Sequence, residues 1–256
     1  MSNGRSGPAV ATALVRVGEV AELTMAACRQ RIRSRRDAAL VFEQLDQLGV
    51  RSLSIVNLTA LFMGMVLALQ MGNFLAKFGA QIFVSRIVGV SLLRELAPVL
   101  TALMVGGRVG AGITAELGSM SVTEQIDAIR SLGADPVRKL VVPRLIALLV
   151  MLPLLTVIAD AVGIAGGCLI SVTELGLTAE FYTTTLLQAL AFSDFFSGLG
   201  KAVFFAYAIG IIACHNGLTV RGGADGVGRA TTSTVVAASV AVLVADFFLS
   251  KLFLAL

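Results

Sequence analysis

Residues 52–76 read SLSIVNLTALFMGMVLALQMGNFLA and contain no charged side chain. A helix needs about 20 mostly apolar residues to cross the hydrocarbon core of a bilayer, and its backbone amides must be satisfied within the segment. This stretch is long enough, and Arg51 and Lys77 bound it. We therefore predict a membrane-spanning helix here.

The composition of the whole chain supports a membrane protein. Of its 256 residues 57% are hydrophobic, and 14% are charged against about 25% in soluble globular domains. These values argue against a disordered protein, a secreted disulfide scaffold and a soluble enzyme. The three cysteines form no C-x-x-C pair, so neither a disulfide framework nor a zinc site is predicted.

Four further apolar stretches are long enough to span a bilayer, so the predicted fold is an all-α integral membrane protein with five transmembrane helices. Residues 1–50 are predicted to form a cytoplasmic or interfacial region, and residues 51–256 the membrane domain. The predicted spans cover about 52–76, 87–113, 145–172, 186–214 and 230–254.

The orientation follows from the basic residues. Lys and Arg accumulate in the first 51 residues, between the second and third spans, and before the fifth, whereas residues 173–185 hold two glutamates and no base. Cytoplasmic loops carry the excess of Lys and Arg. The N-terminus is therefore predicted to be cytoplasmic and the C-terminus periplasmic, and the net charge of +4 reflects topology rather than nucleic-acid binding.

The N-terminal region is not expected to be a signal peptide, because its first charges are not followed by an apolar core of the right length. Apolar residues recur there at near-helical spacing beside arginines, which favours an amphipathic helix on the inner leaflet. A solvated basic helix is the alternative. The apolar positions are Leu14, Val17, Val20, Leu40, Val41, Leu45 and Leu48.

Residues 116–144, between the second and third spans, are too polar to cross the membrane. Ser121 and Glu124 have the spacing of a capping box, and Gly133 is a helix stop signal. The pattern predicts a short cytoplasmic helix over about 121–132. Such a helix is either a lever held between two spans or a segment lying on the membrane surface.

Charged residues inside the spans are expensive and usually face a partner or a cavity. Asp160 and Asp194 are expected to face water or the outer interface. The other such residues are predicted to form one network between spans two, four and five, acting either as structural glue or as a switch or proton relay. They are Arg94, Glu95, Lys201 and Asp246.

An apolar face marks the end of the first span, where Leu67, Phe74, Leu75 and Phe78 recur at helical spacing. Such a face contacts lipid or another helix, or lines a site for an acyl chain.

The chain lacks the motifs of an ATPase or a hydrolase. Lys201 follows Gly200, but Phe195 stands where a P-loop needs its first glycine. His215 has no Cys or second His partner, so it is interpreted as a structural or interfacial histidine and no metal site is predicted.

Several runs carry more specific information: LLRELAPVLTAL at 92–103, GRVG at 107–110, TAELG at 114–118, TEQID at 123–127, DP at 135–136, and GRATT at 228–232 leading to Asp246-Phe247. Together they resemble the signature of the MlaE/YrbE permeases over about residues 50–256. Ala97 departs from the pattern, since many members have glycine there.

The resemblance implies the MlaE-like ABC permease fold and the transmembrane subunit of an ATP-driven lipid transporter in the bacterial inner membrane, working as a homodimer. Its partners would be a cytoplasmic ABC ATPase, which binds ATP and Mg, a STAS-domain protein, and an MCE-domain protein on the outer face. Phospholipid would be the substrate, with a role in outer-membrane lipid asymmetry. No cofactor in this chain and no nucleic acid are implied.

The resemblance also suggests roles for residues. Leu67, Phe74, Leu75 and Phe78 map onto the face lining the lipid cavity, and the four charges map onto intramembrane charges of the family. The residues expected to contact the ATPase, through a coupling helix, are Glu124, Gln125, Ile126, Asp127 and Ile129. Two alternatives stay open: a proton-coupled secondary transporter using the intramembrane charges, and a non-transporting membrane anchor for an ATPase.

Overall fold

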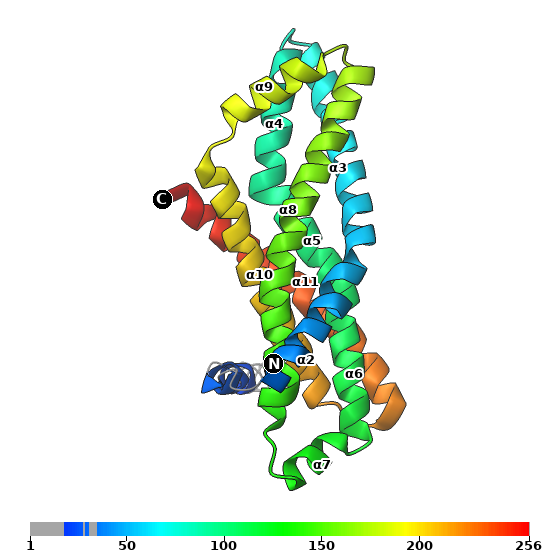
Figure 1. Cartoon of the computed structure of the whole chain (residues 1–256). Coiled ribbons are helices and arrows are strands. Elements are labelled where there is room, and N and C mark those ends of the chain that lie inside the picture. The colour runs from blue at the N-terminus through cyan, green and yellow to red at the C-terminus, as the bar shows by residue number, and fades with distance from the viewer. Residues whose placement is uncertain (1–17, 28, 31–34, 256) are drawn as a thin grey trace, which may run out of the picture.

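The computed structural model describes residues 18–27, 29–30 and 35–255, and within them the chain forms helices and no strand (Figure 1). Five helical stretches of this part are long and apolar enough to cross a membrane, which confirms the predicted class of fold. They run over Ala39–Ala76, Gln81–Val122, Val137–Thr173, Phe192–Leu218 and Gly223–Phe253.

The first two spans are built from several joined segments. The first joins α2 (Arg35–Gln44) through short π and 3-10 turns to α3 (Leu53–Ala76). In the second span two π-helical turns interrupt the α-helix, and such turns are frequent at functional sites. Its segments are α4 (Val84–Ser91), η4 (Leu92–Leu96), α5 (Ala97–Val105), η5 (Gly106–Gly110) and α6 (Ala111–Val122).

The remaining elements complete the bundle. A short helix, α7 (Gln125–Ser131), turns the chain at one end of the molecule. The long helix α8 (Val142–Thr173) then runs the length of the bundle, and α9 (Ala179–Ala189) crosses the opposite end. The last two are α10 (Phe192–Leu218) and α11 (Gly223–Ala255).

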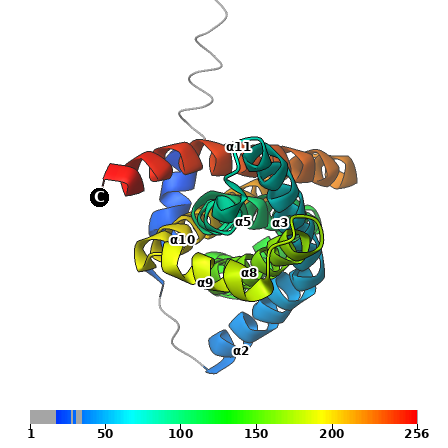
Figure 2. The same cartoon turned by 90° about the horizontal axis from the view of Figure 1, so that it is seen from above.

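The helix α11 lies on the outside of the bundle, as Figure 2 shows from above. Only 11% of its most apolar stretch is buried, compared with 50% in α8 and in α10. The side of α11 that faces away from the chain carries Val236, Val240, Leu243 and Phe247, each more than half exposed.

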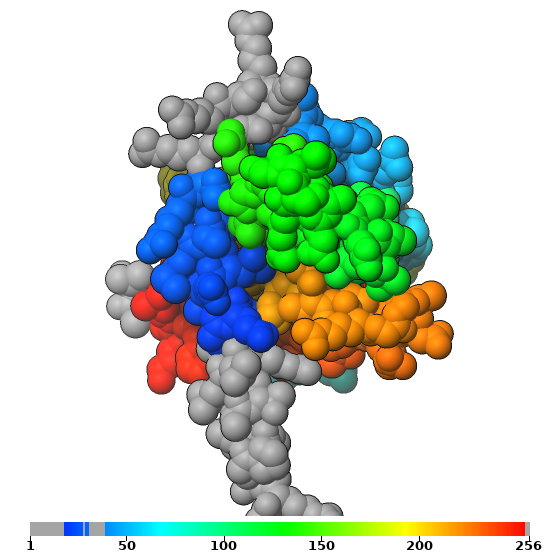
Figure 3. Space-filling model, turned by 90° about the horizontal axis from the view of Figure 1, so that it is seen from below, coloured from blue at the N-terminus to red at the C-terminus, as the bar shows by residue number. Residues whose placement is uncertain are grey.

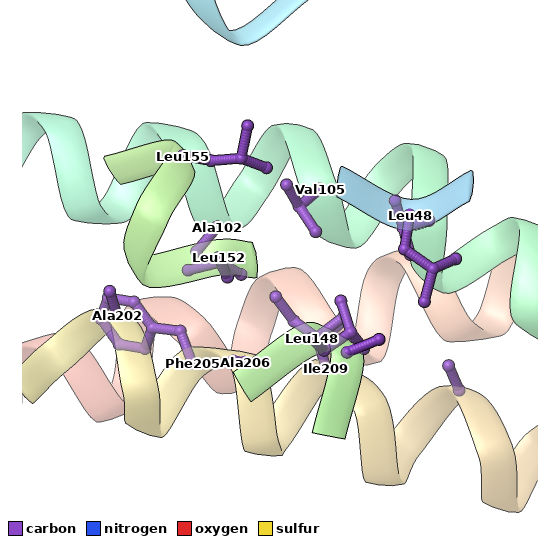
Figure 4. Packing of buried hydrophobic residues seen from close by; sticks show 14 of the residues in the cluster. Leu48, Ala102, Val105, Leu148, Leu152, Leu155, Ala202, Phe205, Ala206 and Ile209 are labelled. Atoms are coloured by element: carbon purple, nitrogen blue, oxygen red, sulfur yellow. The ribbon is translucent and has the colours of Figure 1, made fainter. Parts of the chain in front are cut away.

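The main core lies between α8, α10 and α5 (Figure 4). Leu148 and Leu152 of α8 pack with Phe205 and Ile209 of α10 and Ala102 of α5, and all five are almost fully buried. Apolar side chains gain little by leaving lipid for another apolar surface, so this contact depends on close van der Waals packing.

The contact between α3 and α8 is made by small residues, which we call the small-residue seam. A Cβ added at Gly64 would lie 1.9 Å from the carbonyl oxygen of Gly163, and one at Gly166 would lie 2.4 Å from that of Leu61. The two backbones therefore touch, as in small-xxx-small packing. The members of the seam are Ala60, Gly64, Gly163, Gly166 and Gly167.

Several predicted boundaries were wrong. The helix of the second span runs to Val122 instead of ending near residue 113, and that of the fifth begins at Gly223 instead of near residue 230. The fourth span does not begin at residue 186, because α9 ends at Ala189 and the backbone of Leu190 and Ala191 is extended before α10 starts at Phe192. The predicted start of the short helix at residue 121 was also wrong, because α6 continues through Val122.

The predicted capping box is absent from the start of α7. The N-cap residue is Glu124, which has a left-handed φ of 59°, and no side chain caps the helix. Thr123 instead donates its hydroxyl proton to the carbonyl of Ser119 within α6. The predicted stop is confirmed, since Gly133 adopts a φ of 75° and its N–H donates to the carbonyl of Arg130.

The N-terminal segment of residues 18–27 is helical, and Val20 and Leu23 pack against the main core. Leu14 and Val17 lie outside the described residues. The position of this segment on a membrane surface stays a prediction.

Candidate functional site

Lys201 of α10 is the centre of a polar cluster among the spans. The side chain is fully buried, and its Nζ lies 2.6 Å from Glu95 Oε2 of η4 and 3.1 Å from Asp246 Oδ1 of α11. The same nitrogen donates to Ser250 Oγ at 2.7 Å, and that hydroxyl contacts Glu95 at 3.1 Å. We call Glu95, Lys201, Asp246 and Ser250 the Lys201 cluster.

The local sequence of η4 explains how the cluster gains one more acceptor. Pro98 has no N–H and cannot donate to the carbonyl of Arg94, four residues earlier in the chain. The ammonium group of Lys201 donates to this carbonyl at 3.0 Å. Proline therefore exposes a backbone oxygen at a depth where an unpaired carbonyl is costly, and Lys201 satisfies it.

A glycine in α10 brings the two helices close enough for these contacts. A Cβ added at Gly198 would lie 2.1 Å from the carbonyl oxygen of Leu93, so α10 touches the backbone of η4 here. Lys201 follows three residues later, on the same side of α10. The short distance from Lys201 to Glu95 depends on this approach.

The predicted network was only partly right in geometry. Glu95, Lys201 and Asp246 meet, but the guanidinium of Arg94 turns to Asp194, with Nε 3.1 Å from Oδ1. The other carboxylate oxygen of Asp194 accepts the N–H of Ala191 at 3.0 Å and caps the start of α10. Asp194 is buried, which contradicts the expectation that it faces water or the outer interface.

Asp160 in the middle of α8 is also buried, with 8% of its surface exposed, so the same expectation was wrong for it. Its Oδ1 has no hydrogen-bond partner in the described part of the chain. Burying a carboxyl oxygen without a hydrogen-bond partner is costly.

The Lys201 cluster has chemical consequences. Two carboxylates and one ammonium leave one formal negative charge in the cluster. A cavity of about 200 Å³ lies beside it and is bordered by Arg94, Glu95, Ser197 and Ser250. The arrangement ties together the second, fourth and fifth spans and places polar groups next to an open space.

The predicted lipid-facing residues divide into two pairs. Leu67 and Leu75 are half-buried and pack against a small cluster that contains Val84. Phe74 and Phe78 are exposed, and their rings lie 5.4 Å apart. The exposed apolar surface of α3 also extends along the helix toward its N-terminus. It includes three residues that the sequence interpretation left out: Phe62, Val66 and Leu69.

The residues predicted to contact an ATPase lie on and beside α7, at one end of the molecule (Figure 1). Glu124, Gln125 and Asp127 are exposed, whereas Ile126 is buried and Ile129 is half-buried. Ile126 therefore holds α7 against the bundle. Leu132, at the end of α7, is 85% exposed and was missed by the sequence interpretation.

Two further polar contacts join different spans, and the sequence interpretation missed both. Arg144 of α8 is buried and pairs with Glu116 of α6 at 2.8 Å. Arg108 of η5 donates to Ser52 Oγ at 2.6 Å. A single sequence shows these side chains as ordinary cytoplasmic charges, because their partners come from other spans.

Comparison with known proteins identifies the family. The family model described as permease MlaE matches residues 41–252. A probable ABC transporter permease protein of Rickettsia bellii is 42% identical over 237 residues, which cover 93% of this chain and 92% of the relative. The intermembrane phospholipid transport system permease protein MlaE of Haemophilus influenzae is 40% identical, over 85% of this chain and 84% of the relative.

A plant protein is also similar. Protein TRIGALACTOSYLDIACYLGLYCEROL 1, chloroplastic, of Arabidopsis thaliana is 38% identical over 82% of this chain and 60% of its own length. The matched region contains all five spans except the first two residues of the first span and the last residue of the fifth. The chain therefore belongs to the MlaE permease family.

Proposed function

We propose that this chain is the transmembrane subunit of an ATP-driven ABC transporter that moves phospholipids between the inner membrane and an MCE-domain protein on the outer face. In this role it would help to maintain the lipid asymmetry of the outer membrane. The observation that carries the proposal is the 40% identity, over most of both chains, to a permease named for intermembrane phospholipid transport.

ATP hydrolysis belongs to a partner in this proposal, because the chain has no P-loop of its own. A cytoplasmic ABC ATPase binds ATP and Mg and contacts α7 through Glu124, Gln125 and Asp127, which are exposed at the end of the molecule. A STAS-domain protein is a further proposed partner on the same side.

The proposed working unit is a homodimer. The exposed apolar side of α11 and the exposed residues Phe74 and Phe78 of α3 supply apolar surface that a second copy or lipid tails would cover. Two copies would enclose a cavity for phospholipid tails, lined in part by Leu67 and Leu75. ATP-driven movement of α7 would reshape that cavity, which requires the lipid to bind the two states with different affinity.

The test is lipid transfer by the purified complex of this chain with its ATPase in liposomes, using a fluorescent phospholipid and an MCE-domain acceptor. We expect transfer that depends on ATP hydrolysis. Phe74→Ala should reduce the transfer rate, and Phe204→Ala is the matched control because Phe204 is an exposed phenylalanine on α10, away from the proposed cavity.

The two alternatives give different results. A proton-coupled transporter would move lipid with this chain alone, in response to a proton gradient and without ATP. A membrane anchor would show no transfer in any condition, and substitutions in the Lys201 cluster would change only assembly with the ATPase. Either result would reject the proposal.

A further inference from the structure

A polar cleft of about 500 Å³ lies at the end of the bundle that carries α7, far along α10 from the Lys201 cluster. Three parts of the chain form it: the segment of residues 18–27, the end of α10 with the turn after it, and the start of α11. Figure 3 shows the first and the last of these side by side on this face. The lining residues are Glu19, His215, Asn216, Thr219, Arg221, Arg229, Ala230 and Ser233.

The cleft has an excess of positive charge. Arg221 and Arg229 make no ion pair with a carboxylate in the described part of the chain, whereas the arginines at the other polar contacts, such as Arg94 and Arg144, do. Among the described residues, the only carboxylate of the lining is Glu19, whose Oε2 lies 3.5 Å from His215 Nε2. Two guanidinium groups therefore face one carboxylate that already has a partner.

The backbone keeps Arg229 close to the turn that carries Arg221. A Cβ added at Gly222 would lie 3.4 Å from Nη2 of Arg229, so this guanidinium lies against the glycine next to Arg221. Gly222 and Gly223 both have positive φ, which allows the tight turn between α10 and α11. The two arginines are thus held at one site instead of spreading along a surface.

The remaining groups do not change the sign of the charge. The end of α10 contributes partial negative charge and the start of α11 partial positive charge, and these contributions oppose each other. Ser233 and Thr219 add hydroxyl groups to the lining. Arginine binds phosphate oxygens with paired N–H donors, so the cleft matches an oxyanion better than a neutral ligand.

We propose that this cleft binds a phosphate-bearing anion, with Arg221 and Arg229 as its ligands and Glu19 as a carboxylate that weakens binding. The chemistry is shared by the headgroup of an anionic phospholipid and by free inorganic phosphate. The proposal is independent of the proposed transport function, because that function assigns no role to any residue of the cleft.

The experiment is native mass spectrometry of the purified full chain in detergent, titrated with phosphatidylglycerol, phosphatidylcholine or inorganic phosphate. Arg221→Gln and Arg229→Gln should each weaken phosphatidylglycerol binding by about tenfold, because each removes a charge-assisted hydrogen bond. Glu19→Gln should strengthen it. Lys139→Gln is the matched control, since it removes an exposed positive charge elsewhere at the same end.

The pattern of the variants decides the outcome. Arginine-dependent binding of phosphatidylglycerol over phosphatidylcholine supports a lipid ligand, and arginine-dependent binding of phosphate, with displacement of the lipid, supports a free anion. The proposal is overturned if Lys139→Gln weakens binding as much as the arginine variants, because a general surface charge then explains the effect. It is also overturned if folded arginine variants, checked by thermal melting, bind like the wild type.

Discussion

The Lys201 cluster and the small-residue seam hold the same bundle together by opposite means. The seam joins α3 to α8 without a charged side chain, and Gly64 and Gly163 let the two backbones touch. The cluster joins η4, α10 and α11 through a fully buried ammonium group and two carboxylates. One contact depends on shape and the other on compensation of charge.

The two contacts differ in the free energy that their burial costs. Burying an ion is expensive, and apolar packing of similar volume is often at least as stabilising. Small residues achieve tight packing between α3 and α8 at no such cost. A cluster built around a buried ion is therefore poorly suited to a purely structural role in joining helices. This favours a functional role for Lys201 and its partners.

The largest effect is expected from Lys201→Met. This substitution removes the fully buried cation from the carboxylates of Glu95 and Asp246, whose side chains are 44% and 22% exposed. Breaking a fully buried pair costs about 3–5 kcal/mol, and the partial exposure of the carboxylates lowers the expected loss to about 2–3 kcal/mol. Thermal melting of the purified chain in detergent measures this loss of stability. A melting temperature like that of the wild type would show that water or protons already compensate the carboxylates.

A triple variant separates glue from function. Combining Lys201→Met with Glu95→Gln and Asp246→Asn removes all the formal charges, so stability should return to near that of the wild type. If the cluster acts in transport, the rescued protein will still fail to transfer lipid. Full recovery of both stability and transfer would show that the cluster has only a structural role.

The next effect is expected at the seam. Gly64→Ala places a Cβ 1.9 Å from the carbonyl oxygen of Gly163, and because neither backbone can move alone, α3 must shift away from α8. Overpacking of this kind costs about 1–3 kcal/mol. Gly112→Ala in α6 is the control, since a Cβ there meets no atom within 4 Å. Equal melting temperatures for the two variants would contradict a tight seam.

The features that depend on hydropathy could be predicted from the sequence, whereas those that depend on contacts between helices could not. Residues 52–76 identify a span by themselves, and counting along helices places Glu95, Lys201 and Asp246 at similar depth. The break at Leu190–Ala191 carries no glycine or proline, so the apolar residues of α9 were read as part of the fourth span. This error hid Asp194 as the partner of Arg94.

The roles of Gly198 and Ser250 could not be predicted either, because they depend on residues of other helices. Gly198 matters because Leu93 lies against it, and Ser250 matters because Lys201 reaches it. Neither contact leaves a trace in the local pattern of residues. Pro98 did carry a signal, since a proline four residues after Arg94 frees a carbonyl at membrane depth.

A smaller effect is expected at the edge of the cluster. Arg94 is one-third exposed, so the pair with Asp194 is partly screened by its surroundings. Arg94→Gln should cost about 1–2 kcal/mol, mostly because Asp194 loses a charged partner while it still caps α10. A double-mutant cycle with Asp194→Asn measures the coupling between them. Additive effects of the two substitutions would mean that the pair contributes nothing of its own.

The smallest change in stability is expected where charges lie outside the bundle. Asp127 and Arg130 of α7 form an ion pair 3.2 Å long, and both side chains are more than 60% exposed. Asp127→Asn should change the free energy of unfolding by less than about 0.5 kcal/mol, because water screens the pair. In the proposed transporter the same change alters the contact with the ATPase, so ATP-dependent lipid transfer should fall while the melting temperature stays constant. A loss of stability without loss of transfer would place Asp127 in the fold of α7 and outside the ATPase contact. The contrast with Lys201 then becomes quantitative: removing the buried charge lowers the melting temperature, whereas removing the exposed charge lowers lipid transfer at constant melting temperature.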